Sequence, residues 1–322
     1  MADTDNASIF LVGILAHNEE GVIRESINSV LSQSLRGKDE LKVVVVTNGC
    51  TDETEKIVLE MAKRDQRVEL LSIREAGKVN AVKQFIEYVK EKKDRLNFNC
   101  DRVFMMDADI KFKDNFTLTN LSDRLNEDDY LYAVGANCLP ESLFNKNIDF
   151  VSILYRIQAN LQQIYTPNVL RGMLYCIKLS ILERITFPEN LLADDVYLEC
   201  ILDGHYLMDY GSKIVYKLHK SLRREIRRNL LHCIGVRQVY HLLAKGEFHR
   251  IDHDNRRDYL KPSYFNYEEI LFYLLRRLRF FSLIILLIHY TYYRINIIKA
   301  RKIVEMAYRD GADLRRYWRT RK

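Results

Sequence analysis

The chain has 322 residues, of which 48% are hydrophobic, and it carries a formal net charge of +6. This length and apolar content suffice for a full core, which excludes disorder over most of the chain. The 4 prolines and 12 glycines, without any internal repeat, exclude a low-complexity linker between independent modules.

The charge changes sign along the chain. Residues 220–322 carry 24 basic against 10 acidic side chains, whereas residues 1–219 carry 26 against 34. This asymmetry predicts that the C-terminal part meets an anionic partner, either phospholipid headgroups or nucleic acid, and that the acidic front part can hold a metal. A solvated basic face is the alternative interpretation of the same pattern.

The cysteines and the first residues indicate the compartment. No C-x-x-C pair and no zinc-type spacing occurs, which is typical of reduced, packed thiols in a cytosolic protein. Residues 1–8 are polar and acidic, and the apolar run that follows has no basic lead-in, so no secretory signal is expected. The six cysteines are Cys50, Cys100, Cys138, Cys176, Cys200 and Cys233.

Strand-like and helix-like segments alternate through the first third of the chain. Short, nearly continuous apolar runs are typical of strands buried on both faces, and the segments between them have apolar positions at helical spacing. The pattern predicts an α/β domain with a mostly parallel sheet and helices on both faces. The predicted strands are residues 9–16, 42–47, 68–73 and 102–106, and the predicted helices are residues 19–33, 52–64 and 79–92.

Polar motifs follow three of these predicted strands. His17-Asn18-Glu19-Glu20 follows the first, Asn48-Gly49-Cys50-Thr51-Asp52 the second, and Asp107-Ala108-Asp109 the fourth. Ligands of such sheets bind beyond the carboxyl ends of the strands, where loops and helix N-termini offer free amides. The sequence therefore predicts one binding site at this edge of the sheet.

Asp107 and Asp109 are the strongest single signal for chemistry. Two carboxylates one residue apart at a strand end can converge on one cation, and hard divalent metals prefer oxygen ligands completed by phosphate and water. A diphosphate bridged by such a metal becomes a good leaving group. We expect the metal to be Mn²⁺ or Mg²⁺.

The second part of the chain is predicted to be helical and basic. An arginine-rich helical pattern covers residues 221–245, and residues 280–293 form an apolar peak flanked by arginines. About 14 residues fall short of the roughly 20 that span a bilayer, so we expect an interfacial or shallowly inserted helix. A buried core helix or a dimer helix is the alternative, which leaves open whether the chain forms a homodimer.

The motifs together resemble those of glycosyltransferase family 2, the inverting enzymes with a GT-A fold. The resemblance covers roughly residues 9–245. It implies a GT-A catalytic domain over residues 1–220, followed by a basic, helical, membrane-associating region over residues 221–322. The motifs that carry it are Ala16 to Glu20, Asn48 to Thr54, Gly77-Lys78, Asp107-Ala108-Asp109 and Leu192 to Asp195.

The resemblance also implies roles on the donor side. His17 and Glu19 would lie at the nucleoside, Lys78 would reach the nucleotide or its diphosphate, and Asp107 would contact the nucleotide as well as the metal. Asn48 stands where the family often has an aspartate that faces the base. A UDP-sugar is the first expected donor, and the asparagine leaves guanine donors open.

On the acceptor side, the resemblance makes Asp195 the general base and gives Asp194 the task of positioning the acceptor or the base. Gly172 would line the acceptor side, and His219 would be a further metal ligand. From the residues alone, Asp194 and Asp195 also fit an acidic pair at a helix start.

Processive family members carry a Q-x-x-R-W motif, and the corresponding stretch here, residues 226–232, has neither the glutamine nor the tryptophan. We therefore expect transfer of a single sugar, to a lipid-linked or polysaccharide acceptor. The basic C-terminal region implies a cytoplasmic protein bound peripherally to the inner face of a membrane, with no nucleic acid as partner.

Two alternative functions would each explain part of the sequence. A sugar-nucleotide pyrophosphorylase would need a glycine-rich loop after the first strand, where residues 13–21 offer only Gly13 and Gly21. A non-catalytic basic membrane adaptor would explain the tail but not three carboxylate-bearing motifs at strand ends. Neither G-x-G-x-x-G nor G-K-[ST] occurs, which disfavours a nicotinamide-binding protein and a P-loop NTPase.

Overall fold

The computed structural model describes residues 8–96, 99–141, 169–217, 222–246, 280–309 and 314. The chain forms two compact units, which are described separately. The first unit comprises Met1–Cys138, Leu170–Phe187 and His205–Tyr216, and the second comprises Leu139–Val169, Pro188–Gly204 and Lys217–Lys322.

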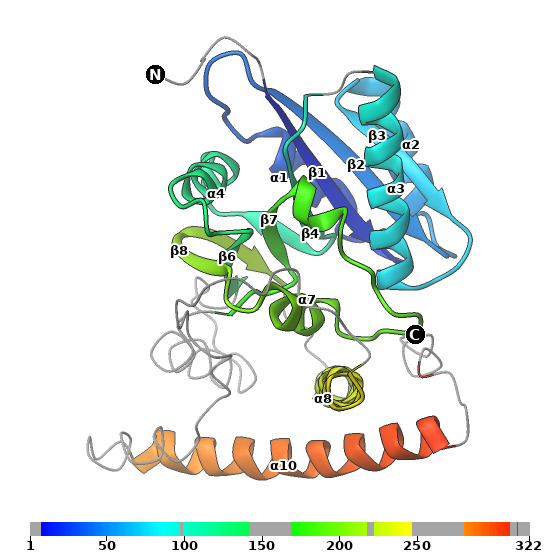
Figure 1. Cartoon of the computed structure of the whole chain (residues 1–322), viewed down its shortest axis with the longest axis vertical. Coiled ribbons are helices and arrows are strands. Elements are labelled where there is room, and N and C mark those ends of the chain that lie inside the picture. Colours follow the sequence, from blue (N-terminus) through cyan, green and yellow to red (C-terminus); the bar gives the residue numbers. More distant parts are fainter. Residues whose placement is uncertain are drawn as a thin grey trace. The chain divides into compact units, whose positions relative to one another are not determined.

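The first unit is built on one eight-stranded sheet with the strand order β3-β2-β1-β4-β7-β6-β8-β5. Helices pack against this sheet (Figure 1), so the predicted α/β class is confirmed. The strands are β1 (Ile9–Ala16), β2 (Glu40–Asn48), β3 (Val68–Ile73), β4 (Arg102–Asp107), β5 (Ile110–Phe112), β6 (Ala133–Pro140), β7 (Leu174–Lys178) and β8 (Tyr206–Tyr216). The helices of this unit are α1 (Ile23–Leu31), α2 (Thr54–Arg64), α3 (Lys78–Leu96), α4 (Thr117–Asn126) and α6 (Leu179–Leu182).

Strands β3, β2, β1 and β4 form the parallel half of the sheet. Every residue from Phe10 to Ala16 of β1 is buried, which requires cover on both faces of the strand and explains its nearly continuous apolar sequence. On one of these faces Phe85 of α3 lies so close to Gly13 that a Cβ there would be 2.7 Å from the ring. Glycine at this position therefore permits the close packing of α3 on β1.

Two helices start later than the sequence predicts, for the same reason. The predicted helix at Glu19 begins at Ile23, and the one predicted at Asp52 begins at Thr54. Between each strand and its helix, residues form hydrogen bonds with the neighbouring loop or within their own loop, so these residues have non-helical partners.

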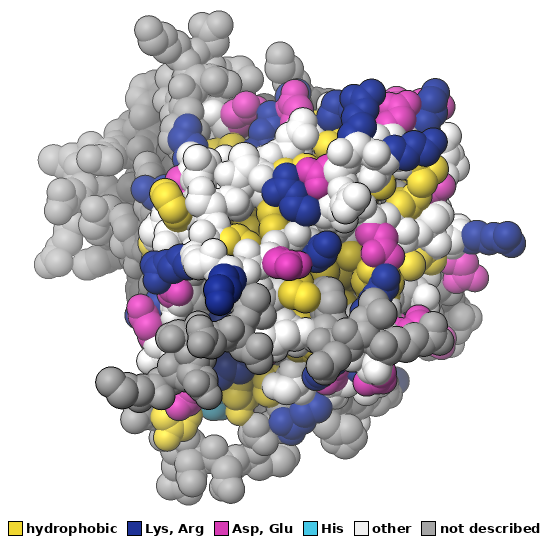
Figure 2. All heavy atoms as spheres, turned by 90° about the horizontal axis from the view of Figure 1, so that it is seen from above, with side chains coloured by type: hydrophobic (Ala, Val, Ile, Leu, Met, Phe, Trp, Pro, Cys, Tyr) yellow, Lys and Arg dark blue, Asp and Glu magenta, His cyan; other side chains and the backbone are white. Residues whose placement is uncertain are grey.

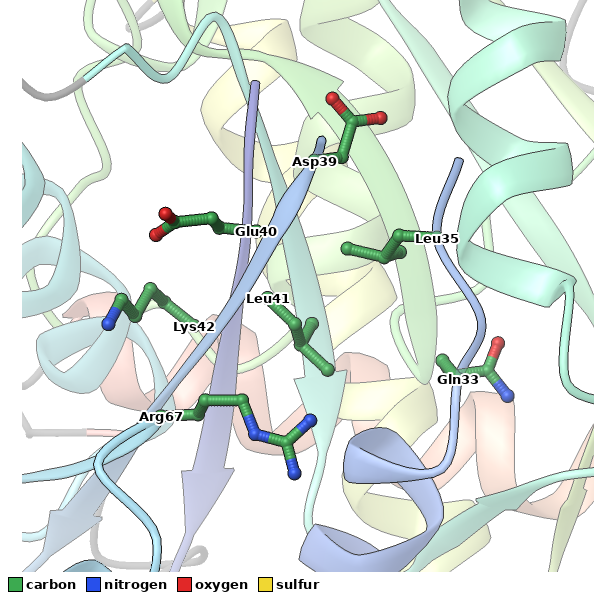
Figure 3. Close-up of a pocket in the computed structure, with 7 residues that line it drawn as sticks. All are labelled: Gln33, Leu35, Asp39, Glu40, Leu41, Lys42 and Arg67. Carbon is green, nitrogen blue, oxygen red and sulfur yellow. The ribbon is translucent and has the colours of Figure 1, made fainter. Parts of the chain in front are cut away.

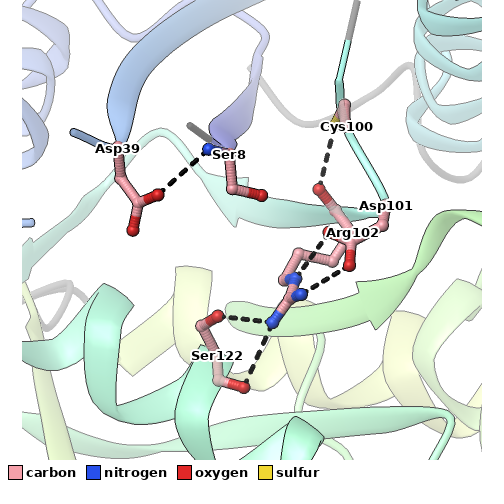
Figure 4. A network of polar contacts seen from close by, with 6 residues as sticks. All are labelled: Ser8, Asp39, Cys100, Asp101, Arg102 and Ser122. Atoms are coloured by element: carbon pink, nitrogen blue, oxygen red, sulfur yellow. Dashed lines mark hydrogen bonds and ion pairs between the residues drawn. The ribbon is translucent and has the colours of Figure 1, made fainter. Parts of the chain in front are cut away.

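The antiparallel half of the sheet was not predicted from the sequence. β7 pairs antiparallel with β4 and β6, and β5 pairs antiparallel with β8. At the start of β4, Arg102 fixes α4 to the sheet, since its Nη1 donates to Oγ of Ser122 over 2.7 Å while its Nε donates to Asp101 over 2.7 Å (Figure 4). These hydrogen bonds join the start of β4 to α4 and to the residue before the strand.

The second unit contains three described helices, α7 (Asp194–Leu202), α8 (Leu222–Ala244) and α10 (Phe280–Arg309). α8 and α10 lie side by side and share a small core, formed by Cys233, Ile234, Ala300, Val304, Ala307 and Leu314. The apolar stretch 280–293 is thus the first half of a 30-residue helix. Among the described residues, no helix combines the length and the apolar content needed to cross a bilayer.

Candidate active site

The register of the parallel strands brings the predicted motifs together at one edge of the sheet. Ala16 is paired with Thr47, and Leu15 is paired with Asp107. The loops that follow β1, β2 and β4 therefore start next to one another, as the sequence predicts for parallel strands.

Asn48 is the hub of this edge. Its side chain is only 2% exposed, its Nδ2 donates to the carbonyl of Ala16 over 2.9 Å, and its Oδ1 accepts from the amide of Gly77 over 3.1 Å. The main-chain carbonyl of Asn48 also contacts Nδ1 of His17 at 2.6 Å. One buried amide thus links the loops that follow β1, β2 and β3.

This environment explains why position 48 holds an amide and not a carboxylate. One end of the side chain must donate to a carbonyl while the other accepts from an amide, and an ionised aspartate can only accept. The role predicted for Asn48 at the nucleobase stays a prediction, and the structure adds a task inside the protein. This task could not be predicted from the sequence, because both partners are main-chain groups distant in sequence.

Gly49 lets two strand-end loops approach closely. Its backbone is left-handed, with φ of 59°, and a Cβ at this position would lie 2.8 Å from the amide nitrogen of Ala76. Its amide donates to Ile73 over 2.8 Å. A glycine is required here by both the conformation and the contact.

The loops after β1 and β2 are locked together by reciprocal hydrogen bonds. Oδ1 of Asn18 accepts from the amide of Thr51 over 2.8 Å, and the hydroxyl of Thr54 accepts from the amide of Glu19 over 2.8 Å. Asp52 accepts from the amides of Thr54 and Glu20. Burial raises the pKa of this carboxyl, but the hydrogen bonds outweigh burial, so the pKa of Asp52 lies below its ordinary value.

Lys78 connects this edge to the predicted metal site. It is the first residue of α3, directly after Gly77, and its Nζ lies 2.9 Å from Oδ1 of Asp107. The same Nζ lies 3.4 Å from the carbonyl oxygen of Gly172, which is buried just before β7. Three residues that were predicted separately therefore meet at one point.

The two predicted metal-binding carboxylates flank a tight turn. Asp107 ends β4, Ala108 is buried, and half-buried Asp109 precedes β5. No group of three or more potential metal-ligating side chains occurs among the described residues. The oxygen donors of Asp107 and Asp109 nevertheless fit a hard divalent cation that takes its other ligands from phosphate and water. His219 lies outside the described residues.

Arg171 is a cation at this site that the sequence analysis did not single out as a site residue. It precedes Gly172, and its Nη1 donates to the carbonyl of Cys138 over 3.1 Å. Burial raises the pKa of the Cys138 thiol to about 12, and the charge of Arg171 opposes that rise. Its position next to Gly172 was the sequence feature that could have identified it as a site residue.

The predicted catalytic pair lies in the second unit. Asp194 and Asp195 form the first turn of α7; Asp194 is 4% exposed, whereas Asp195 is half-buried and its Oδ1 accepts from the amide of Val196 over 2.9 Å. Carboxylates in the first turn complement the helix dipole. Asp195 is thus the more accessible of the two.

Gln238 of α8 supports the loop in front of this pair. Its Oε1 accepts from the amide of Leu192 over 2.9 Å, and its Nε2 donates to the carbonyl of Asn190 over 2.9 Å. Gly235, one turn earlier, lets α8 pack against Ala193, since a Cβ there would be 2.7 Å from that of Ala193. Neither residue was predicted, because both lie more than 40 residues from the loop they hold.

An open groove of about 430 Å³ lies elsewhere on the first unit (Figure 3). It includes Glu40 and Lys42, at the start of β2, and is therefore at the opposite edge of the sheet from Asn48. One face of the molecule carries interspersed basic and acidic side chains, without a large patch of one sign (Figure 2). Neither the groove nor the distribution of charge indicates a functional site away from the carboxyl ends of the strands.

Comparisons with known proteins show a family match and a similar fold. The model of the family "Glycosyl transferase family 2" matches residues 11–169. A mannosyltransferase of Pyrobaculum calidifontis, solved with GDP-Man and Mn²⁺, aligns with a TM-score of 0.57 and 19% identity over 98% of this chain and 85% of that chain. Glucosyl-3-phosphoglycerate synthase of Mycobacterium tuberculosis aligns with a TM-score of 0.48 and 18% identity over 74% of this chain and 80% of that one. No curated protein matches the chain.

The family match and the fold define a nucleotide-sugar glycosyltransferase of the GT-A class. Residues 11–169 belong to glycosyltransferase family 2.

Proposed function

We propose that this enzyme is an inverting, metal-dependent transferase that moves one sugar from a nucleoside-diphosphate sugar to a lipid-linked or polysaccharide acceptor. One observation supports the donor part of this proposal. Lys78, Asp107 and Gly172 converge at the strand ends whose loops Asn48 links. A carboxylate pair and a lysine at such an edge provide charges of both signs for a metal and a diphosphate.

In this proposal Asp107 and Asp109 hold Mn²⁺ or Mg²⁺, which would stabilise the negative charge of the departing diphosphate. Lys78 binds the diphosphate oxygens, and His17 and Glu19 lie at the nucleoside. His219 is proposed as an additional metal ligand. Asn48 holds the loops that carry these groups and stands next to the base.

Asp195 is proposed as the general base. It removes the proton from the acceptor hydroxyl as the hydroxyl oxygen bonds to the anomeric carbon and the bond from that carbon to the diphosphate breaks. One displacement inverts the configuration at this carbon. Asp194, which is nearly fully buried, helps to position the base, and Gly172 lies on the acceptor side.

A UDP-sugar is the first candidate donor, and a GDP-sugar is the second. The second is favoured by one observation, since the Pyrobaculum enzyme with the TM-score of 0.57 was solved with GDP-Man. A binding titration with UDP and GDP, each with Mn²⁺, distinguishes the two. If neither UDP nor GDP bound to the chain, the donor assignment would be contradicted.

We further propose that residues 1–220 form the catalytic domain and that the basic residues 221–322 bind the inner face of a membrane peripherally. The charge of the C-terminal part and the apolar stretch 280–293 support this proposal. Activity on a lipid-linked acceptor should exceed activity on the same glycan without its lipid. Equal activity on both acceptors would argue against a lipid-linked substrate.

A further inference from the structure

One face of α10 is occupied by the protein itself. Ala300, Val304 and Ala307 are buried against α8, and the ring of Tyr308 lies tilted against that of His241 with 4.1 Å between the ring centroids. Lys245, directly after the end of α8, also lies over the ring of Tyr308. These contacts fix the rotation of the described part of α10 and decide which side chains lie on its opposite face.

The opposite face exposes large apolar side chains. Ile295 is 46% exposed, Ile298 is 55% exposed and Met306 is 52% exposed. Their spacing places them on one side of a helix, about half a turn away from Ala300 and Val304. Two isoleucines and one methionine, each about half exposed and grouped on one helix face, indicate an interaction surface.

Basic side chains are interleaved with these apolar ones. Lys299, Lys302 and Arg309 are exposed on the same side of α10, and Arg294 and Arg301 are exposed at its borders. Glu305, paired with Arg301, is the one acidic side chain on α10 between residues 291 and 309. This outer face of α10 is therefore apolar and cationic at once.

We infer that the outer face of α10, defined by Ile295, Ile298, Lys299, Lys302, Met306 and Arg309, docks on an anionic phospholipid bilayer. Apolar side chains enter the boundary between headgroups and acyl chains, while lysines and arginines bind the anionic headgroups. This inference rests on the peripheral membrane binding in the proposed function and assigns it to specific residues. It concerns helix residues beyond the apolar stretch 280–293.

The composition of the face favours a bilayer over two other occupants. A second copy of the chain would bring like charges together across a two-fold axis, and three apolar side chains cover far less than the ~800 Å² that each partner of a stable interface buries. Bound nucleic acid would place its charged phosphates against the apolar side chains of Ile298 and Met306, which cannot bind them. The vesicle experiment also distinguishes the bilayer from each of these two occupants.

The test measures sedimentation of the full chain with vesicles of phosphatidylcholine, with or without phosphatidylglycerol. A face variant combines Ile298→Ser, Lys302→Glu and Met306→Ser. A matched control combines Leu59→Ser and Lys63→Glu, which are exposed on α2. A charge variant, Lys299→Glu with Lys302→Glu, keeps every apolar side chain and guards against a folding defect in the first variant.

We expect the wild-type chain and the control to bind vesicles with phosphatidylglycerol, and binding to decrease with salt. Each basic side chain near an anionic surface contributes about fivefold, so both α10 variants should partition at least ~10-fold more weakly. Equal binding of wild type and face variant, or no preference for anionic vesicles, would overturn the inference. So would a change from dimer to monomer in the face variant with unchanged vesicle binding, or salt-sensitive binding of a DNA duplex in place of vesicles. Vesicle binding requires no donor, so its failure is distinguishable from failure of the proposed transferase.

Discussion

The ammonium group of Lys78 lies 2.9 Å from Oδ1 of Asp107, the carboxylate proposed to hold the divalent metal. Both side chains are about three-quarters buried, with exposed fractions of 27% and 29%. A protein cation and a metal ion that share one carboxylate repel each other. A donor diphosphate placed beside both would relieve this repulsion, because it can bind Lys78 and the metal together.

Replacing Lys78 should therefore change metal binding and donor binding in opposite directions. In Lys78→Met we expect Mn²⁺ alone to bind about fivefold tighter, which is the size of one partly exposed ion pair, and the donor to bind more weakly. Calorimetric titration with Mn²⁺ alone and with nucleoside diphosphate plus Mn²⁺ measures both. Lys83→Met, a change on the same helix, is the control. Weaker Mn²⁺ binding in Lys78→Met would contradict the repulsion.

The buried hydrogen bonds of Asn48 predict a specific cost for aspartate. Asn48→Asp removes the donor to Ala16 and sets a carboxylate against its carbonyl, so the free energy of unfolding should fall by about 1–3 kcal/mol. The loss should be larger at neutral pH, where the carboxyl is ionised, and smaller in acid, where its protonated oxygen can donate again. Denaturant unfolding at two pH values measures it.

Asn18→Asp provides the matched control, because its Oδ1 accepts from Thr51 in a half-buried position and an aspartate keeps that bond. We expect a change in stability of less than about 0.5 kcal/mol for it. If both variants were equally stable, the hub role of Asn48 would have to be abandoned.

The role of Asp195 predicts a loss of turnover without a loss of donor binding. Asp195→Asn should lower kcat by about 100- to 10,000-fold, the usual contribution of a general base. Asp203→Asn, an exposed change just after the same helix, should leave kcat nearly unaltered. Steady-state rates and a donor titration measure the two quantities. Near-normal turnover of Asp195→Asn would remove this residue from the role.

Gln238 should act on catalysis through the loop it holds. Gln238→Met keeps the volume but leaves the amide of Leu192 and the carbonyl of Asn190 without their partner, which costs about 1–3 kcal/mol of stability. We expect kcat to fall by about tenfold with donor affinity unaltered, because the loop leads into Asp194 and Asp195. Arg237→Met is the neighbouring control. A variant with full kcat, or one that lost donor affinity instead, would show that this loop does not position the base.

The parallel half of the sheet and its strand-end motifs could be predicted because apolar runs and parallel pairing are local and repetitive. Once parallel strands are recognised, Asp107 and Asn48 must end at the same edge. The starts of α1 and α2 could not be predicted, because the residues before them hydrogen-bond to a neighbouring loop. The antiparallel half pairs strands that lie far apart in sequence, so no local pattern marks it.

The supporting residues of the site were also beyond sequence reasoning. In the sequence, Gln238 cannot be distinguished from other polar residues of a basic helix. Only the structure shows that it is 2% exposed and hydrogen-bonded to the loop before Asp194. The same holds for the amide of Asn48, whose partners are main-chain groups. Chemistry-bearing residues stand out by type, whereas residues that position them stand out only by their contacts.

The most direct test of the central claim is the melting temperature of the purified chain with UDP, GDP and their sugars, each with Mn²⁺ and with a chelator. Binding at about 100 times Kd stabilises a protein by about 2.7 kcal/mol, which raises Tm by several degrees. We predict such a rise with one of the two nucleotides and Mn²⁺, its loss on chelation, and no rise in Asp109→Ala. No rise with any nucleotide, or an equal rise in chelator, would contradict a metal-dependent nucleotide-sugar transferase.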